Sequence, residues 1–267
     1  METTIRLYHE IKGVVQRFVT ALHFATFLKT KGRKLALTLT DILTLALFKQ
    51  SSNIATKKKL YEICDPHCSY KTLVVNLNRW AYLAAIILAL IMKMNRINQH
   101  PIKHIDSTDI PVCLFKNANA HKTMKALSAF GRSAKGTFFG LRLHIITDLV
   151  RKLLTITFTA GNVNERTVVI PMSEEIWGIL VGDAGYVSEK LAKEFHVEGK
   201  RIFIAKPRAN MKKLMTEFQQ KLYDTRALIE INFRNLKLFY GLVTSLPRSV
   251  DGYLAHYIYS LTAYQLV

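Results

Sequence analysis

The sequence predicts an α/β fold in which a mixed sheet with flanking helices follows an all-helical N-terminal region. Over residues 1–98, apolar side chains recur every three or four positions, which is the period of an amphipathic helix. Beyond Pro101 the pattern changes to short apolar or alternating runs bounded by turn-forming residues, which is typical of strands. We therefore divide the chain into a helical region, 1–100, and an α/β region, 101–267.

The helical region is expected to consist of short helices joined by turns, including one near 69–79 and one near 80–97. A short helix before them carries Lys57, Lys58 and Lys59. This arrangement fits a helix-turn-helix unit that binds DNA. A small helical domain with another role would show the same pattern, so both interpretations stay open.

In the α/β region, strands and helices alternate in the order β-β-β-α-β-α-β-α. The expected strands are 102–106, 137–147, 153–159, 178–183 and 201–206, and the expected helices are 164–169, 188–196 and 214–240. The fourth strand is an apolar run, which predicts that it is buried and parallel to its neighbours.

The charge of the chain points to a polyanionic partner. The 267 residues carry a net charge of +19. Residues 1–100 hold 15 Lys and Arg against 5 Asp and Glu, and the remainder holds 23 against 14, so both halves are basic. Nucleic acid is the commonest partner of such a protein. A basic protein without such a partner is the alternative at this stage.

Cysteine content and hydropathy favour a soluble protein in a reducing compartment such as the cytoplasm. The three cysteines, Cys64, Cys68 and Cys113, are too few and too uneven for a disulfide framework. No second Cys or His pair follows Cys64 and Cys68 at zinc-binding spacing. The most apolar run, 81–92, is shorter than the roughly 20 residues of a membrane span, so we expect a buried helix.

Two aspartates, Asp106 and Asp183, are expected at the ends of strands, where ligand sites gather in α/β sheets. Their neighbours include Ser107, Gly182 and Gly185, whose small side chains leave room for a metal ion and a phosphate. Taken alone, either aspartate is better explained as the cap of a turn.

The helix expected over 214–240 makes a catalytic role more plausible. Tyr223, Arg226, Glu230 and Lys237 lie at offsets of 0, 3, 7 and 14 residues. On one unbroken helix these side chains share an arc of about 60°, beside an apolar face. An ordinary solvated stripe with ion pairs would look similar, but Arg before Glu is the less favourable order for such a pair.

The spacing Y-(2)-R-(3)-E-(6)-K resembles the signature of insertion-sequence transposases with a DDE domain, in the insertion-sequence-four-like group. Other segments are similar to motifs of that family: Ile105–Thr108 and Val181–Tyr186 around the two aspartates, Lys135–His144, and Gly161–Glu165. Leu141 and Arg142 depart from the family pattern, and Glu165 stands where Asp is common. The resemblance covers about residues 101–267.

The resemblance implies a ribonuclease H-like catalytic domain. It also implies two Mg²⁺ or Mn²⁺ ions held by Asp106, Asp183 and Glu230, which would be the catalytic residues. Arg226 and Lys237 would bind DNA phosphates, and Tyr223 would position a DNA strand or a flipped base. The implied partner is double-stranded DNA, as the element's terminal repeats and the target. A homodimer or higher oligomer on DNA is expected, in the bacterial cytoplasm at the nucleoid.

Two other functions fit the same residues. A nuclease on the ribonuclease H fold would share the three carboxylates but would need no defined end sequence. A DNA-binding protein from a decayed mobile element would have lost catalysis, although the presence of all three carboxylates argues against it.

Overall fold

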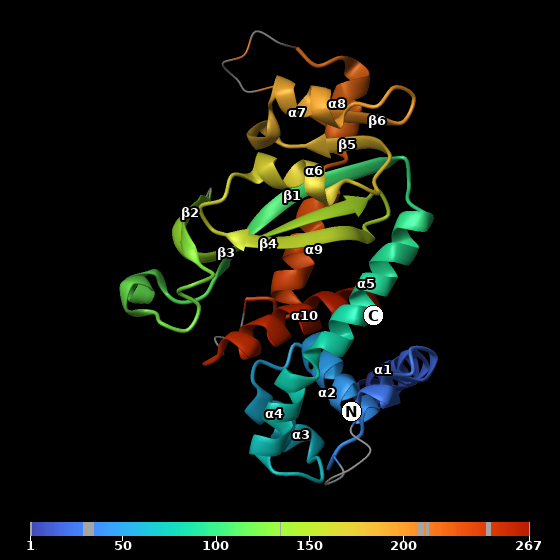
Figure 1. Cartoon of the computed structure of the whole chain (residues 1–267), viewed down its shortest axis with the longest axis vertical. Helices are drawn as coiled ribbons and strands as arrows, with labels where there is room; N and C mark the ends of the chain where they lie inside the picture. Colours follow the sequence, from blue (N-terminus) through green and yellow to red (C-terminus); the bar gives the residue numbers. More distant parts are fainter. Residues whose placement is uncertain are drawn as a thin grey trace. The chain divides into compact units, whose positions relative to one another are not determined.

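The computed structural model describes residues 2–28, 35–133, 135–207, 211, 214–243 and 247–266. The chain forms two compact units, of which one comprises Met1–Ile91 with Arg234–Val267 and the other Met92–Phe233. The first unit is helical and the second contains the sheet (Figure 1). The last part of the chain, counted with the α/β region above, therefore belongs to the helical unit. The roles of the two regions stay predictions.

The helical unit is built around a central helix. Its elements are α1 (Glu2–Ala21), η1 (Phe24–Phe27), α2 (Leu39–Ser51), α3 (Lys57–Cys64), α4 (Tyr70–Arg79), the larger part of α5 (Ala81–Ile97) and α10 (Val250–Leu266). Nearly every side chain of α2 is buried, and α2 contacts α1, α4 and α10. Thr38, Thr56 and Ser69 begin α2, α3 and α4, because each side chain accepts a hydrogen bond from a backbone N–H of the first turn.

One helical stretch, Tyr70–Ile97, has the length and composition to cross a membrane. It comprises α4 and α5, and part of its apolar side chains face the core of the helical unit. Leu73, Leu77, Leu83 and Ile87 are at most 1% exposed. Other apolar side chains of the stretch are exposed, Tyr82 at 42% among them, so burial accounts for only part of its composition.

The second unit holds a mixed sheet of six strands within the described residues. They are β1 (Ile102–Pro111), β2 (Ala129–Ser133), β3 (Gly136–Asp148), β4 (Leu153–Ala160), β5 (Gly178–Gly182) and β6 (Arg201–Ala205). The order is β2-β3-β1-β5-β6, with β4 also paired to β3. The pairs formed by β3 are antiparallel, whereas β5 is parallel to β1 and β6, as the apolar run at 178–183 predicts.

Helices cover the sheet and complete its core. Four short elements pack with Ile105, Leu180 and Phe203 of the sheet. They are η3 (Glu165–Val168), α6 (Val169–Met172), η4 (Ala184–Tyr186) and α7 (Glu189–Phe195). Helix α8 (Glu217–Asp224) contacts β5 and β6, and α9 (Ala227–Leu238) follows it. The predicted fold class, a ribonuclease H-like mixed sheet with flanking helices after an all-α region, is confirmed.

Two strands differ from the expectation. β1 was expected over 102–106 but continues to Pro111, because it pairs with β3 along nine positions. Asp106 therefore lies in the middle of the strand and not at its end. β2 was not expected, since Gly131 and Ser133 favour a turn in an isolated segment. Pairing with β3 supplies the hydrogen bonds, and Gly131 is needed because a Cβ there would collide with the backbone of Gly161.

Candidate active site

Asp106 stands at the centre of the candidate site. Its side chain is 15% exposed, and its Oδ2 accepts a hydrogen bond from Nη1 of Arg226 at 2.7 Å. Its Oδ1 accepts from the backbone N–H of Ser107 at 2.8 Å. Burial, together with the charges of Asp183 and Glu230, raises the pKa of Asp106 to about 6, against the opposing effects of Arg226 and of the Ser107 N–H. The three predicted carboxylates therefore lie close enough to interact.

Arg226 joins two of these carboxylates. Its Nη2 donates to Oε1 of Glu230 at 2.6 Å, while its Nη1 donates to Asp106. The Arg226 side chain is 16% exposed, whereas that of Glu230 is 59% exposed. The guanidinium also lies 5.7 Å from the ring centre of Tyr223, and the ammonium of Lys206 lies 4.8 Å from the same ring. Arg226, expected to bind phosphate, thus pairs with carboxylates in this structure.

The single helix expected over 214–240 is wrong, because Thr225 and Arg226 form a turn between α8 and α9. The hydroxyl of Thr225 donates to the carbonyl of Leu222 at 2.6 Å. Because that hydroxyl has only one proton, Nε2 of His104 must donate to Thr225 Oγ1, at 2.8 Å. A threonine hydroxyl that bonds the backbone in this way competes with helical hydrogen bonds. The break therefore occurs without any Gly or Pro.

His104 holds this turn from the sheet. It lies two residues before Asp106 on β1, so both side chains project from the same face. Its side chain is fully buried, and burial together with the charge of Arg226 lowers its pKa to about 4. A neutral His104 suits a ring that donates through Nε2 only. His104 is not among the residues predicted for the site, although its two-residue spacing from Asp106 would place it on the same face of the strand.

Asp183 follows β5 directly and caps the short element η4. Its Oδ1 accepts a hydrogen bond from the N–H of Gly185 at 2.8 Å. The ring of Tyr186 is fully buried behind it, and its hydroxyl lies near Ser107 without a well-aligned hydrogen bond. Burial raises the pKa of Tyr186 well above its ordinary value, and Asp106 and Asp183 raise it further. Asp183 therefore caps a turn through Oδ1, as the alternative interpretation of this residue predicts. Its Oδ2 takes no part in this cap.

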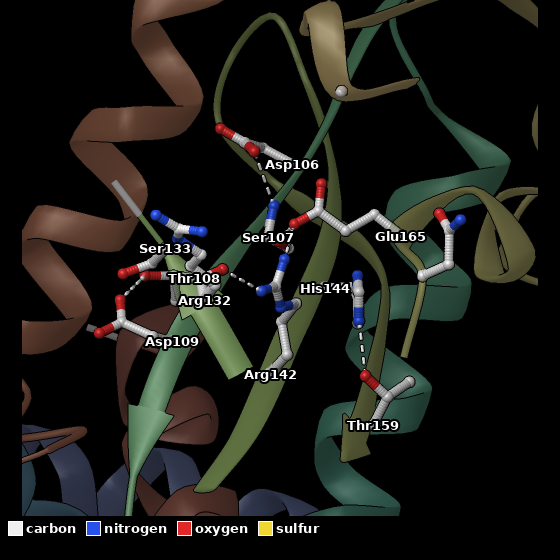
Figure 2. A network of polar contacts seen from close by, with 12 residues as sticks. Asp106, Ser107, Thr108, Asp109, Arg132, Ser133, Arg142, His144, Thr159 and Glu165 are labelled. Atoms are coloured by element: carbon white, nitrogen blue, oxygen red, sulfur yellow. Dashed lines mark hydrogen bonds and ion pairs between the residues drawn. The ribbon is translucent and has the colours of Figure 1, made fainter. Parts of the chain in front are cut away.

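A fourth carboxylate, Glu165, joins the cluster from η3. Figure 2 shows its carboxylate between Ser107 and Arg142, and it accepts hydrogen bonds from both. The distance from Ser107 Oγ to Glu165 Oε1 is 2.7 Å. A Cβ built on Gly185 would lie 3.5 Å from Glu165 Oε2 and 3.0 Å from Asp183 Oδ1. Gly185 therefore separates two carboxylates, and a side chain there would crowd both.

The donor set fits divalent cations in its chemistry. Four carboxylates lie among basic side chains: Arg142 and Arg226 pair with three of them, and Arg166 also lies beside the cluster. Carboxylate oxygens are the ligands that Mg²⁺ and Mn²⁺ prefer. No group of three or more His, Cys, Asp or Glu side chains in the described part of the chain is arranged as a ready metal site. Arg226 stands between Asp106 and Glu230, so cation binding there requires its side chain to shift.

Lys237 is the predicted residue that these contacts do not include. It lies on α9, seven residues beyond Glu230, and is half-buried. The division between the compact units falls between Phe233 and Arg234, so Lys237 is counted with the helical unit. Its role at the site stays a prediction.

A family model described as a transposase DDE domain matches residues 96–249, which is more than half of the chain. The matched segment includes Asp106, Glu165, Asp183, Arg226 and Glu230. No curated protein matches the chain in a sequence comparison.

Proposed function

Since this chain belongs to the transposases with a DDE domain, we propose that it cuts and joins DNA at the ends of an insertion sequence. The observation that carries the proposal is the cluster in which Arg226 connects Asp106 with Glu230 while Asp183 interacts with Asp106. Hydrolysis and transesterification of a phosphodiester need little covalent chemistry from a protein. They need charged groups that position and stabilise the reacting phosphate.

Asp106, Asp183 and Glu230 would hold two Mg²⁺ or Mn²⁺ ions. Two such ions activate an attacking hydroxyl and stabilise the leaving oxygen. Divalent cations would offset the charge of these carboxylates and attract a phosphodiester.

The chain's own residues would position the DNA. Once its side chain has shifted from the carboxylates to admit cations, Arg226 would offer the five donors of its guanidinium to a phosphate oxygen. Tyr223 presents a ring already flanked by two cations, where it would orient a strand or a flipped base. Lys237 would bind phosphate further along the DNA. His104 and Thr225 fix the turn that carries Arg226.

The partners follow from the reaction. We propose double-stranded terminal repeats and target DNA as substrates, and a homodimer or higher oligomer that holds two ends together. The compartment would be the bacterial cytoplasm, at the nucleoid. The spacing of Tyr223, Arg226, Glu230 and Lys237 favours the insertion-sequence-four-like group. The helical region, with its exposed Lys58 and Lys59, would contribute to end binding.

The test is a cleavage assay on DNA that spans the element's ends, with Mg²⁺ and with Ca²⁺. We expect strand cleavage and joining at the ends with Mg²⁺, and binding without cleavage with Ca²⁺. Cleavage independent of the end sequence would support a ribonuclease H-fold nuclease instead. Specific binding with no cleavage under any metal would indicate a decayed element.

A further inference from the structure

The charged side chains in the segment between Asp109 and Asp148 are all positive. Its 38 residues contain no Asp or Glu and six Lys and Arg. Arg142 forms an ion pair with Glu165 of the candidate site. The other five are exposed, and none of them forms an ion pair with a described carboxylate: Lys116, Lys122, Lys125, Arg132 and Lys135.

The same segment exposes apolar side chains among these cations. Leu114, Phe115, Leu127 and Phe130 are between 45% and 60% exposed. The rings of Phe115 and Phe130 lie edge to face with centroids 6.1 Å apart. We call these four residues, with Lys116, Lys122, Lys125 and Arg132, the aromatic–basic surface. Exposed apolar side chains that gather in one place, with two rings in contact, make this segment a candidate binding surface.

The rings belong to an ordered substructure. The segment containing η2 (Phe115–Ala120) projects beyond the end of the sheet next to β2 and β3 (Figure 1). Met124 in it is fully buried, and its N–H donates to Nε2 of His121 at 3.2 Å. Phe130 packs on Phe139 of β3 at 5.0 Å. The rings are thus held in place, which lowers the entropy lost when a ligand packs on them.

The surface adjoins the carboxylate cluster through direct contacts. Arg132 lies two residues after Phe130 on β2, on the same exposed face. Its carbonyl accepts a hydrogen bond from Nη2 of Arg142 at 2.8 Å, and Arg142 also pairs with Glu165 (Figure 2). Glu165 accepts from Ser107, the neighbour of Asp106. The strand that carries Phe130 and Arg132 is therefore connected to the carboxylate cluster through Arg142 and Glu165.

We propose that the aromatic–basic surface binds unpaired nucleotides of the DNA end, with bases stacked on Phe115 and Phe130 and phosphates held by the surrounding lysines and Arg132. The proposal rests on the proposed function and names the part of the substrate that lies next to the cut. In a duplex, base pairing and stacking hide the faces of the bases. Aromatic rings interleaved with cations are the combination that binds single strands. A second copy of the chain fits less well, because a symmetric contact would place these cations against themselves.

The experiment measures binding of a fluorescein-labelled single strand and of the matching duplex by anisotropy, in EDTA so that cleavage is absent. F115A/F130A should weaken single-strand binding on the order of ten-fold or more. Duplex binding should change by less than about two-fold. F115L/F130L is the matched control, because leucine keeps the apolar surface but removes the aromatic face. It should lose as much as the alanine pair.

The charges are tested with K122E/K125E against K190E/K193E, a pair of exposed lysines on α7. The first pair should weaken single-strand binding about ten-fold more than the second. A 2-aminopurine base in the strand should be quenched by the wild type and not by F115A/F130A. Thermal melting of each variant shows that it is folded.

Three results would overturn the proposal. The first two are wild-type affinity for the single strand in F115A/F130A and in F115L/F130L. The third is a wild-type dimer that F115A/F130A and K122E/K125E both dissociate, as measured by sedimentation. The last would assign the surface to a second copy. The protein could instead bind single strands through these rings and yet cut no element end. That result would contradict the proposed function, and the assignment of this surface to single-strand binding would stand.

Discussion

The turn between α8 and α9 offers the sharpest test of how the site is positioned. In Thr225→Val the side chain keeps its shape and loses its hydroxyl. His104, which is fully buried, then has an Nε2–H donor without an acceptor. An unsatisfied buried donor costs about 1–3 kcal/mol, so we expect a loss of about 2 kcal/mol in the free energy of unfolding.

His104→Leu removes the donor as well and completes a double-mutant cycle. Thr225 still bonds the Leu222 carbonyl in that variant, so we expect a cost of about 1–2 kcal/mol. When both partners are apolar, no buried group is left unsatisfied. The double variant should therefore be more stable than the sum of the singles predicts, by about 1–2 kcal/mol.

Catalysis should follow a different pattern from stability. The turn carries Arg226 and leads to Glu230, and a displacement of about 1 Å at a catalytic group can cost on the order of 10²-fold in rate. Single-turnover cleavage at saturating DNA should fall in both singles and stay low in the double variant, although its stability recovers. Thr262→Val is the control, because that buried hydroxyl bonds the backbone of α10 in the helical unit. It should lower stability by about 1 kcal/mol and leave the cleavage rate unchanged. Strictly additive stabilities, or wild-type cleavage by Thr225→Val, would refute the reasoning.

Four further predictions concern single residues or conditions. Asp183→Asn should abolish cleavage and leave DNA affinity in a binding assay nearly intact, as should Asp106→Asn and Glu230→Gln; cleavage at the wild-type rate would remove the metal-ligand assignment. Lys237→Ala should slow cleavage or joining by on the order of ten- to a thousand-fold, while its thermal melt shows a cost of at most about 0.5 kcal/mol; an unchanged rate would make this lysine ordinary surface. DNA affinity should fall steeply between about 50 and 200 mM salt, and a flat plot of log K against log salt would contradict it. Stability should fall below about pH 6.5 because burial lowers the pKa of His256 to about 3. The unfolded chain then binds a proton that the folded chain excludes, which costs about 2–3 kcal/mol by pH 4.5. In denaturant titrations His256→Gln should lack that part of the pH dependence, and an unchanged profile would assign it to other groups.

Local patterns were sufficient to predict much of the sheet. The strands expected at 137–147 and 153–159 agree with β3 and β4 to within one residue at each end. Their alternation is strong because one face of each is packed. The strand at 178–183 is buried and parallel, as its continuous apolar composition requires.

Features that depend on distant partners could not be predicted. β2 exists because β3 pairs with it, and no property of residues 129–133 alone favours a strand. The break at Thr225 depends on His104, which is 121 residues away in the sequence. The place of Glu165 in the site depends on Ser107 and Arg142, and the sequence pattern around these three residues does not show that their side chains meet.

The spacing of Tyr223, Arg226 and Glu230 still brings their side chains together, although the helix expected to carry them is interrupted. The N–H of Arg226 still bonds the carbonyl of Tyr223, and the N–H of Ile229 bonds the carbonyl of Arg226, so the turn preserves a rise close to that of a helix. The guanidinium therefore still reaches the Tyr223 ring on one side and Glu230 on the other. The interruption ties the Arg226 turn to β1, the strand that carries Asp106, and this connection holds two carboxylates from distant parts of the chain in one cluster.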